Sequence, residues 1–471
     1  MNCLFREFMF SKILIANRGE IALRILRACK EMGISTVAVH STADSDAMHV
    51  KLADESVCIG PSLSCDSYLN IPAIISAAEV SGAEAIHPGV GFLSENSYFA
   101  NVVRDHKMVF IGPSSEHMDV MGNKVSAREK AIELGFDVIS GSLGIVSSEK
   151  DAAGIAKEIG FPVLIKARSG GGGKGMRVVR SLDELKENFE IAKSEAEASF
   201  GDDGVYIERF LSKPRHIELQ MLGDTHGNMV CLGDRDCSLQ KKHQKVFEES
   251  PSPALSRDER EYIFEKAISA MKDFGYYSAG TLEFLYEDGK FYFIEMNTRI
   301  QVEHPITEMI TGIDIVKEQI RIASGGKLGF SQKDVRFRGH AMECRINAED
   351  PMTFLPQPGK IIDYLAPGGP NVRVDSFIFS GYTIPPYYDS LIAKLITYGN
   401  TREECLMTMK RALDEYVITG VKTLIPLHQR LALNEGIVSG SYDTNWLDGF
   451  IFSLQCPPEC SSHWCSLNKA I

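Results

Sequence analysis

The regular alternation of short apolar strands with helices over the first 112 residues constrains the fold most. The pattern predicts a strand over 12–16, a glycine turn at Gly19, and a helix that extends to Glu31. Further strands are predicted over 36–40 and 108–112. Strands that alternate with helices are typical of a parallel, doubly wound α/β sheet. Because Gly19 stands alone, without a G-x-G-x-x-G motif, we expect a Rossmann-like domain that holds no dinucleotide.

The length of the chain, 471 residues, predicts about three domains, since one core rarely serves more than ~150–250 residues. We place an N-terminal Rossmann-like domain at 9–120, a central domain at 128–325 and a C-terminal α+β domain at 338–448. A tail follows over 449–471. Within the central domain, residues 140–211 form a small unit with a glycine-rich loop, which we expect to act as a mobile lid.

The net charge, hydropathy and cysteine content of the chain exclude several classes of protein. The net charge of −13 disfavours nucleic acid as a partner, and no apolar run approaches the ~18 residues of a membrane span. Most of the 11 cysteines lie singly in apolar segments, which predicts a reduced, cytoplasmic protein. The cluster Cys456, Cys460, His463 and Cys465 fits no zinc spacing, so we expect a frayed tail. Charged residues interrupt any signal peptide, and we expect translation to start at Met9.

A glycine run over Ser169–Gly175 follows a strand that ends at Lys166. Glycine lets backbone amides approach phosphate oxygens closely and permits the positive φ that this requires. The run is not a Walker A motif, because Gly175 follows Lys174 and Arg168 replaces the first glycine. A flexible linker explains a glycine run about as well. The position between two strands, beside Lys166, favours a phosphate-binding loop.

The segment 295–304 carries the strongest signal for chemistry. In an extended strand, Glu295, Asn297 and Arg299 lie on one face. A carboxylate, an amide oxygen and a guanidinium in a row suit a hard cation with a phosphate beside it. The alternative is the charged, solvent-exposed face of an edge strand. Apolar neighbours such as Met296 and Ile300 favour a buried location instead.

A second carboxylate, Glu283, lies on the preceding strand, so the two strands form a predicted hairpin. A two-residue loop at Asp288-Gly289 would pair Glu283 with Ile294 and send Glu295 to the opposite face. A three-residue loop with a G1 bulge would pair Glu283 with Phe293 and put both glutamates on one face. If the two carboxylates bind metal together, the three-residue loop is required.

Several motifs together resemble the ATP-grasp biotin-dependent carboxylases, and in particular the biotin carboxylase subunits of bacterial acetyl-CoA carboxylases. They are the glycine run, Met121–Lys124, Glu295–Glu303, Glu343–Asp350, Asn17–Ala22 and His87–Asn96. The resemblance extends from about Lys12 to about Asp448. It implies an α/β chain with a Rossmann-like N-terminal domain, a central ATP-grasp domain with a mobile lid, and an α+β C-terminal biotin carboxylase domain.

The resemblance also implies roles for individual residues. The implied ATP contacts include Lys124, Lys166, Gly172, Gly173, His216, His243 and the adenine-reading strand Glu208, Arg209, Phe210 and Leu211. The implied ligands of two Mg²⁺ or Mn²⁺ ions are Glu283, Glu295 and Asn297, of which the two glutamates thereby also contact ATP. The implied bicarbonate site is formed by Lys245, Arg299, Gln301 and Val302. Glu303 is the implied base, and Arg345 the residue that meets biotin.

The implied reaction is ATP-dependent carboxylation of carrier-bound biotin by bicarbonate through carboxyphosphate. It is the first half-reaction of acetyl-CoA carboxylase, which supplies malonyl-CoA for fatty acid synthesis. The alternative is the biotin carboxylase subunit of another acyl-CoA or pyruvate carboxylase. Because the chain lacks a Met-Lys-Met motif, biotin is expected on a separate biotin carboxyl carrier protein, with separate carboxyltransferase subunits. More distant alternatives are another ATP-grasp ligase or a regulatory subunit that binds ATP without turnover.

The resemblance further implies a homodimer, with Arg27, Glu31 and Arg373 at interface positions. The sequence departs from the family pattern at two places. Val90 replaces a tyrosine near the biotin pocket, and Pro370 replaces an aromatic residue of the dimer interface.

Overall fold

The computed structural model describes residues 9–142, 144–167, 176–241 and 244–455. The predicted N-terminal parallel sheet is confirmed, with five strands in the order β3-β2-β1-β4-β5. Its strands are β1 (Lys12–Ile15), β2 (Ser35–Ser41), β3 (Glu55–Gly60), β4 (Ala85–His87) and β5 (Val109–Phe110). Its helices are α1 (Gly19–Glu31), α2 (Met48–Leu52), α3 (Ile71–Ser81), α4 (Ser97–Asp105) and α5 (Ser115–Gly122).

The loops that follow the neighbouring strands β1 and β4 meet at the carboxyl end of this sheet. The side chain of Asn17, just after β1, donates hydrogen bonds to the carbonyl oxygens of Pro88 (2.7 Å) and Val90 (2.8 Å), just after β4. Two loops far apart in sequence are thereby joined at the edge where parallel α/β sheets commonly bind ligands.

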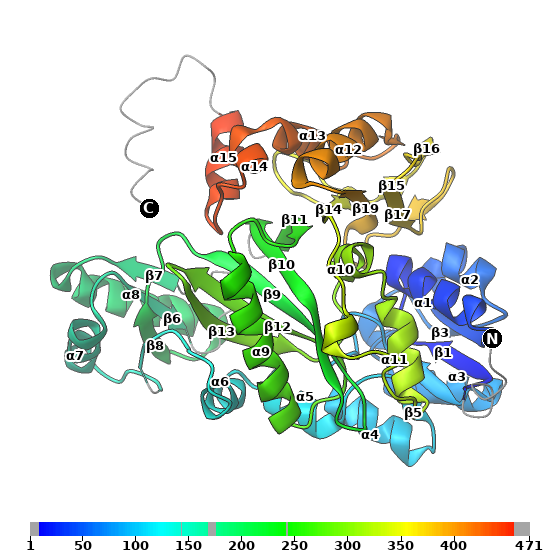
Figure 1. Cartoon of the computed structure of the whole chain (residues 1–471), viewed down its shortest axis with the longest axis horizontal. Helices are drawn as coiled ribbons and strands as arrows, with labels where there is room; N and C mark the ends of the chain where they lie inside the picture. Colours follow the sequence, from blue (N-terminus) through cyan, green and yellow to red (C-terminus); the bar gives the residue numbers. More distant parts are fainter. Residues whose placement is uncertain (1–8, 143, 168–175, 242–243, 456–471) are drawn as a thin grey trace.

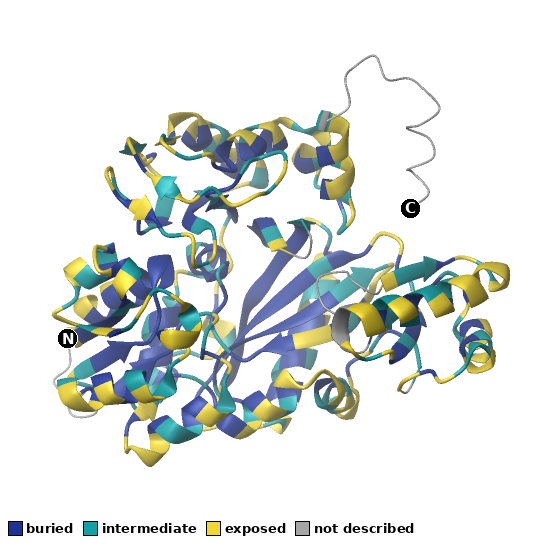
Figure 2. Ribbon diagram, turned by 180° about the vertical axis from the view of Figure 1, so that it is seen from behind, coloured by how far each residue is buried: buried dark blue, intermediate teal, exposed yellow. Residues whose placement is uncertain are grey.

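An antiparallel eight-stranded sheet forms the centre of the molecule, in the order β13-β12-β9-β10-β11-β14-β19-β17 (Figure 1). Its strands are β9 (Arg215–Gly223), β10 (Met229–Lys241), β11 (Gln244–Ser250), β12 (Ser278–Glu287), β13 (Lys290–Asn297), β14 (His340–Asn347), β17 (Val372–Ser376) and β19 (Leu391–Gly399). The pairing of β11 with β14 joins the predicted central and C-terminal domains into one sheet. Figure 2 shows that most of the central strands are buried.

Three helices follow the central strands: α9 (Arg257–Asp273), α10 (His304–Thr311) and α11 (Ile315–Ala323). Helix α9 begins with a capping box in which Ser256 and Glu259 satisfy each other's backbone amides. It packs its apolar side against the sheet through residues such as Ile263 and Phe264.

The predicted lid, residues 140–211, has its own small sheet and its own hydrophobic core. The sheet order is β7-β6-β8, formed by β6 (Val163–Ala167), β7 (Met176–Val179) and β8 (Val205–Arg209). Helices α7 (Glu149–Ile159) and α8 (Leu182–Phe200) pack on it, and α6 (Lys124–Glu133) precedes it. The unit projects from the end of the molecule opposite the N-terminal sheet (Figure 1). A separate core is what a unit needs to move as one body.

The C-terminal region adds four helices to the end of the large sheet. They are α12 (Arg402–Glu415), α13 (Ile425–Leu433), α14 (Glu435–Ser439) and α15 (Trp446–Gln455). Short strands β15 (Gly359–Lys360) with β18 (Thr383–Ile384), and β16 (Tyr364–Leu365) with β20 (Val417–Ile418), form two small sheets. Residues 449–455, assigned from the sequence to the tail, lie in α15, where Ile451 is buried.

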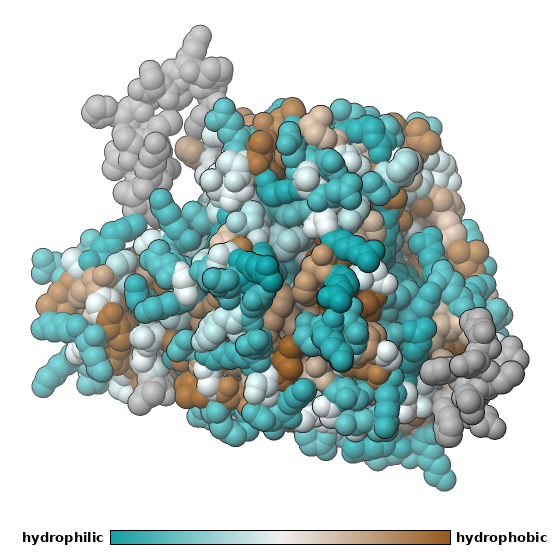
Figure 3. Space-filling view, in the orientation of Figure 1, coloured by the Kyte–Doolittle hydropathy of each residue, from teal (hydrophilic) through white to brown (hydrophobic). Residues whose placement is uncertain are grey.

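Residues 1–8, before the expected start at Met9, and the cysteine cluster after 455 lie outside the described residues. Hydrophilic side chains cover most of the face in Figure 3, with hydrophobic ones in small, separate groups. In the part of the chain that the structure describes, no helix is long and apolar enough to cross a bilayer.

Candidate active site

A cleft of about 1250 Å³ lies between the N-terminal sheet, the lid, the large sheet and the C-terminal region. The predicted site residues within the described ranges all line it. They are Lys124, Lys166, Glu208, Arg209, Phe210, Leu211, His216, Lys245, Glu283, Glu295, Asn297, Arg299, Gln301, Val302, Glu303 and Arg345. Gly172, Gly173 and His243 lie outside the described residues. Residues more than 200 positions apart are thereby gathered around one space.

The hairpin that carries the two glutamates differs from the three-residue loop that joint metal binding was expected to require. Glu287 pairs with Lys290, so the loop has two residues, Asp288 (φ 51°) and Gly289 (φ 78°). Both have the positive φ of a type I′ turn. The register then shifts: Phe284 pairs with Phe293, but Glu283 pairs with Glu295.

The residue skipped by this register shift is Ile294, which forms a β-bulge. A two-residue loop without a bulge would have placed Ile294 opposite Glu283. The bulge therefore achieves what the three-residue loop was expected to do, and both carboxylates line the cleft. The two-residue alternative is the one observed, and the inference that facing glutamates require a three-residue loop was wrong, because a bulge inside a strand leaves no clear mark in a hydrophobic pattern.

The two facing carboxylates fit a hard divalent cation. Glu283 is 4% exposed and accepts hydrogen bonds from Asn297 Nδ2 (2.7 Å) and Gln301 Nε2 (2.6 Å). The expected buried location holds for Glu283 and Asn297 but not for Glu295, which is exposed on β13, the edge strand of the sheet. Desolvation of its carboxylate and the negative charge of Glu283 raise the pKa of Glu295 above its ordinary value. Two like charges held together are stabilised by a cation between them, and carboxylate and amide oxygens are ligands that Mg²⁺ and Mn²⁺ accept. The oxygen atoms of Glu283, Glu295 and Asn297 are therefore chemically suited to bind Mg²⁺ or Mn²⁺.

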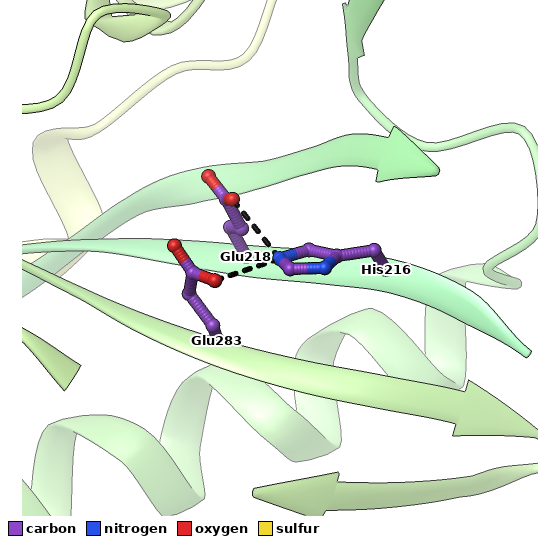
Figure 4. Close-up of side chains that lie close together, drawn as sticks. All are labelled: His216, Glu218 and Glu283. Carbon is purple, nitrogen blue, oxygen red and sulfur yellow. Dashed lines mark ion pairs between the residues drawn. The ribbon is translucent and has the colours of Figure 1, made fainter. Parts of the chain in front are cut away.

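His216 lies between two glutamates at the same end of the cleft. Its Nε2 is 2.8 Å from Glu283, on the adjacent strand β12, and 3.2 Å from Glu218, two residues along β9 (Figure 4). Burial lowers the pKa of His216, but the charge of Glu283 and hydrogen bonds to both glutamates outweigh it and raise it to about 9. A pKa of about 9 favours the protonated imidazole near pH 7, which offsets the negative charge of the two glutamates.

Glu303 is held between two cations. It is 1% exposed and accepts hydrogen bonds from Lys245 Nζ (2.7 Å) and Arg345 Nη2 (2.9 Å). Burial raises the pKa of Glu303, but the charges of Lys245 and Arg345 help to bring it below its ordinary value. The pKa of Glu303 therefore favours an ionised carboxylate, which the two cations hold in the cleft.

Arg299 belongs to a different pairing. Its Nε contacts Glu95 at 2.8 Å, and its Nη2 donates to Asn297 Oδ1 at 2.8 Å. Glu95, in the loop before α4, also accepts from the backbone amide of Thr298 at 3.0 Å. The possibility that Glu303 serves only to orient Arg299 is therefore not supported, since the oriented contacts of Arg299 are with Glu95 and Asn297.

The cleft also combines lysines with apolar walls. Lys166 on β6 forms an ion pair with Glu208 on the neighbouring strand β8. Lys124 is exposed at the first position of α6, where Asn123 caps the helix by accepting from two backbone amides. Apolar residues that line the cleft include Ile139, Leu164, Met176 and Leu285. Apolar walls beside lysines suit a flat base attached to phosphates.

Sequence reasoning missed several buried residues around this site. Glu218, Arg235 and Cys237 are fully or almost fully buried on β9 and β10. The guanidinium of Arg235 donates to Glu218 (3.1 Å), to Thr307 (3.2 Å) and to the side-chain oxygen of Gln301. The run Asp234, Arg235 and Asp236 between apolar segments of β10 is the sequence signal that could have indicated this network, because buried charges need partners.

Comparison with known proteins agrees with this geometry. Residues 9–118 match the family model of the biotin carboxylase N-terminal domain, and residues 343–449 match that of the C-terminal domain. Between them, residues 123–331 match the ATP-binding domain of the carbamoyl-phosphate synthase L chain. The biotin carboxylase of Haemophilus influenzae is 58% identical over 441 residues, which cover 93% of this chain and 98% of that protein.

Solved structures show the same similarity. The biotin carboxylase of Campylobacter jejuni, in a β-γ-ATP complex, has a TM-score of 0.88 and 49% identity, covering 94% of this chain and 99% of the other. The biotin carboxylase domain dimer of the Hydrogenobacter thermophilus 2-oxoglutarate carboxylase, with MgADP, ADP and bicarbonate, has a TM-score of 0.87 at 49% identity and the same coverage. The cleft, its carboxylates and cations, and these matches over the full fold show that the chain belongs to the biotin carboxylases, which are ATP-dependent enzymes.

Proposed function

We propose that this protein carboxylates carrier-bound biotin as the first half-reaction of acetyl-CoA carboxylase, which supplies malonyl-CoA for fatty acid synthesis. One observation carries the assignment of roles: an ionised carboxylate, Glu303, lies between Lys245 and Arg345 in the same cleft as the carboxylate pair Glu283 and Glu295. A base, cations for an anionic substrate and oxygen ligands for metal ions are the groups that phosphoryl transfer to bicarbonate requires.

The nucleotide is proposed to lie along the cleft between the lid and the large sheet. Its phosphates would contact Lys124, Lys166 and the glycine run with Gly172 and Gly173, with His216 and His243 nearby. Its base would lie against the strand Glu208, Arg209, Phe210 and Leu211. Glu283, Glu295 and Asn297 would hold the two Mg²⁺ or Mn²⁺ ions. Bound metal ions would supply electrostatic neutralisation of the charge that develops on the phosphates.

Bicarbonate is proposed to bind among Lys245, Arg299, Gln301 and Val302, all of which line the cleft. Because bicarbonate has a pKa near ~10, a base must take its proton before it attacks phosphorus at neutral pH. Glu303 takes this proton. A bicarbonate oxygen then bonds to the γ-phosphorus of ATP, the bond from that phosphorus to the β–γ bridging oxygen breaks, and carboxyphosphate and ADP result.

Carboxyphosphate then breaks into CO₂ and phosphate, and the phosphate removes the ureido proton of biotin. Arg345 stabilises the negative charge that remains on the biotin ring, and the ring nitrogen attacks CO₂. The guanidinium of Arg345 suits this task, because its Nε and Nη2 are held by carboxylates. Closure of residues 140–211 would exclude water, which would otherwise hydrolyse carboxyphosphate.

The proposed assembly is a homodimer that receives biotin on a separate carrier protein and passes it to carboxyltransferase subunits. A groove near α1 that includes Arg27, Glu31 and Arg373 supports a contact surface at the expected interface positions. We place the protein in the cytoplasm, since the cysteines within the described ranges are free thiols. The alternative, a subunit of another acyl-CoA or pyruvate carboxylase, draws support from the similarity to a 2-oxoglutarate carboxylase domain.

Bicarbonate-dependent release of ADP, measured with and without free biotin, tests the reaction. We expect slow release without biotin, faster release with it, and carboxybiotin as a product. A chain that releases ADP equally without bicarbonate is not acting by this route. Purification of the native protein with its bound carrier and transferase, identified by mass spectrometry, decides between acetyl-CoA carboxylase and the alternative.

A further inference from the structure

Two glutamates meet where the predicted central and C-terminal domains join in the large sheet. Strand β11 pairs with β14 there, and Glu248 lies directly opposite Glu343 in the register. Both side chains are 0% exposed. Directly opposed residues of an antiparallel pair have Cβ atoms about 4.5–5.5 Å apart, so the two carboxyl groups are neighbours on one face.

Their hydrogen bonds are incomplete. Glu248 Oε1 accepts from Arg345 Nε at 2.6 Å, while its Oε2 has no partner among the residues described. Within the same residues, both carboxyl oxygens of Glu343 lack a partner. The nearby buried cation Lys394 does not fill the gap, because its Nζ donates to the Val302 carbonyl (2.7 Å) and pairs with Glu20 (3.1 Å).

An ionised carboxylate without hydrogen bonds is among the most costly groups to bury, whereas a protonated one carries no charge and can donate. One proton placed between the two glutamates turns unpartnered oxygens into a donor and an acceptor. Burial raises the pKa of both groups, that of Glu248 to about 7 and that of Glu343 well above its ordinary value. Glu248 accepts a hydrogen bond from the cation Arg345, whereas neither oxygen of Glu343 has a partner among the described residues. Glu343 is therefore the member that holds the proton.

We infer that Glu248 is a positioning residue for Arg345, and that Glu343 is a neutral carboxylic acid that donates a hydrogen bond to Glu248. This inference rests on the proposed role of Arg345 at biotin. The guanidinium is held by Glu248 through Nε and by Glu303 through Nη2, and its Nη1 has no partner among the described side chains. The other charged groups that face the pair are Lys245 on β11, Lys394 on β19 and Glu303 before α10.

This arrangement matters once Glu303 has taken the proton of bicarbonate. A neutral Glu303 attracts Arg345 less strongly, so Glu248 becomes the remaining anion that holds the guanidinium in place at the cleft. The hydrogen bond from Glu343 keeps Glu248 from taking up that proton itself or turning its free oxygen toward the substrate. The pair would thus serve the second step of the reaction, carboxyl transfer to biotin, more than the cleavage of ATP.

The test compares Glu248→Gln with Glu343→Gln, which replaces the neutral acid by a neutral amide that still donates. In Glu248→Gln we expect the rate of ATP cleavage with bicarbonate alone to stay within about threefold of the wild-type rate. We expect kcat for biotin carboxylation to fall about tenfold or more. Glu248→Asp, which restores the charge, should recover part of this loss. Glu343→Gln should stay within about twofold in both reactions, because a neutral donor replaces a neutral donor.

Equal loss of both reactions in folded Glu248→Gln, or full retention of carboxylation, would overturn the positioning role. Loss in Glu343→Gln as large as in Glu248→Gln would overturn the assignment of the proton. Where a variant fails to fold, infrared spectroscopy of the wild type and the remaining variant tests which glutamate holds the proton. The carbonyl stretch of the protonated Glu343 carboxyl must persist in Glu248→Asp and must be absent in Glu343→Gln. Arg345→Gln distinguishes a failure of this inference from a failure of the proposed function. Retained biotin carboxylation in Arg345→Gln would exclude the proposed role of Arg345 at biotin.

Discussion

Replacing Glu303 with glutamine removes the proposed base while preserving the size of the side chain. The carboxylate accepts from Lys245 and Arg345, and the amide that replaces it can accept from only one of them. Both cations keep other carboxylate partners in this variant. Lys245 retains Glu218 and Glu283, and Arg345 retains Glu248. The variant is therefore expected to fold, which makes its kinetics interpretable.

The size of each effect follows from these contacts. Loss of one hydrogen bond between charged groups costs about 1.5–3 kcal/mol of folding stability. That is less than the ~3–5 kcal/mol for a buried charge stripped of its only partner. Loss of a general base lowers the rate by ~10²–10⁴, which corresponds to about 2.7–5.4 kcal/mol of activation free energy. Binding of Mg-ATP should change little, since Glu283, Glu295 and Asn297 are untouched.

The assay measures Mg-ATP affinity, bicarbonate-dependent ATP cleavage and biotin carboxylation for the wild type, Glu303→Gln and Glu303→Asp. Both reactions should fall together in Glu303→Gln, because the proton is removed before carboxyphosphate forms. Glu303→Asp keeps the charge but moves it by one methylene, and should lie between the two. Close to full turnover by Glu303→Gln at saturating bicarbonate would refute the assignment of the base.

Three further predictions concern the metal ions, acid stability and the lid. Glu295→Gln should raise the Mg²⁺ concentration for half-maximal activity about tenfold or more, because it removes one of two facing carboxylates; an unchanged Mg²⁺ titration would contradict the ligand assignment. Burial lowers the pKa of His49 to about 4, of His87 to about 3 and of His428 to about 4. Below pH ~6.5 the unfolded chain therefore binds more protons than the folded chain. As the pH falls from ~6.5 toward the folded pKa, each histidine lowers the free energy of unfolding by about 1.4 kcal/mol per pH unit. Urea unfolding between pH 7.5 and 5 checks this, and His428→Gln should weaken the dependence; an equally steep dependence in the variant would show that His428 contributes nothing. Amide hydrogen exchange in β6, β8 and α8 should slow when Mg-ATP is added. An exchange rate that is the same with and without Mg-ATP would argue against a lid over 140–211.

Local patterns in the sequence determined the secondary structure of the N-terminal region and the position of the chemical motifs. Alternating strands and helices before Pro113 produce the parallel sheet, because each short apolar strand needs a crossover helix before its parallel neighbour. The residue types and spacing over 295–303 indicated a site of chemistry, and Glu295, Asn297 and Glu303 line the cleft. Residue type and spacing suffice where a feature depends on neighbours within a few positions.

Tertiary structure decided what depends on partners far away in the chain. The bulge at Ile294 sets which face Glu295 takes, and it arises in the pairing of β13 with β12 rather than from the residues of β13 alone. Arg299 is oriented by Glu95, 204 residues away in sequence, and Glu303 by Lys245 and Arg345. Glu248 meets Glu343 only because β11 pairs with β14 across the predicted domain boundary. Periodicity reports which side of an element is apolar, whereas register and charge pairing are chosen among many distant alternatives by the packing of the whole chain.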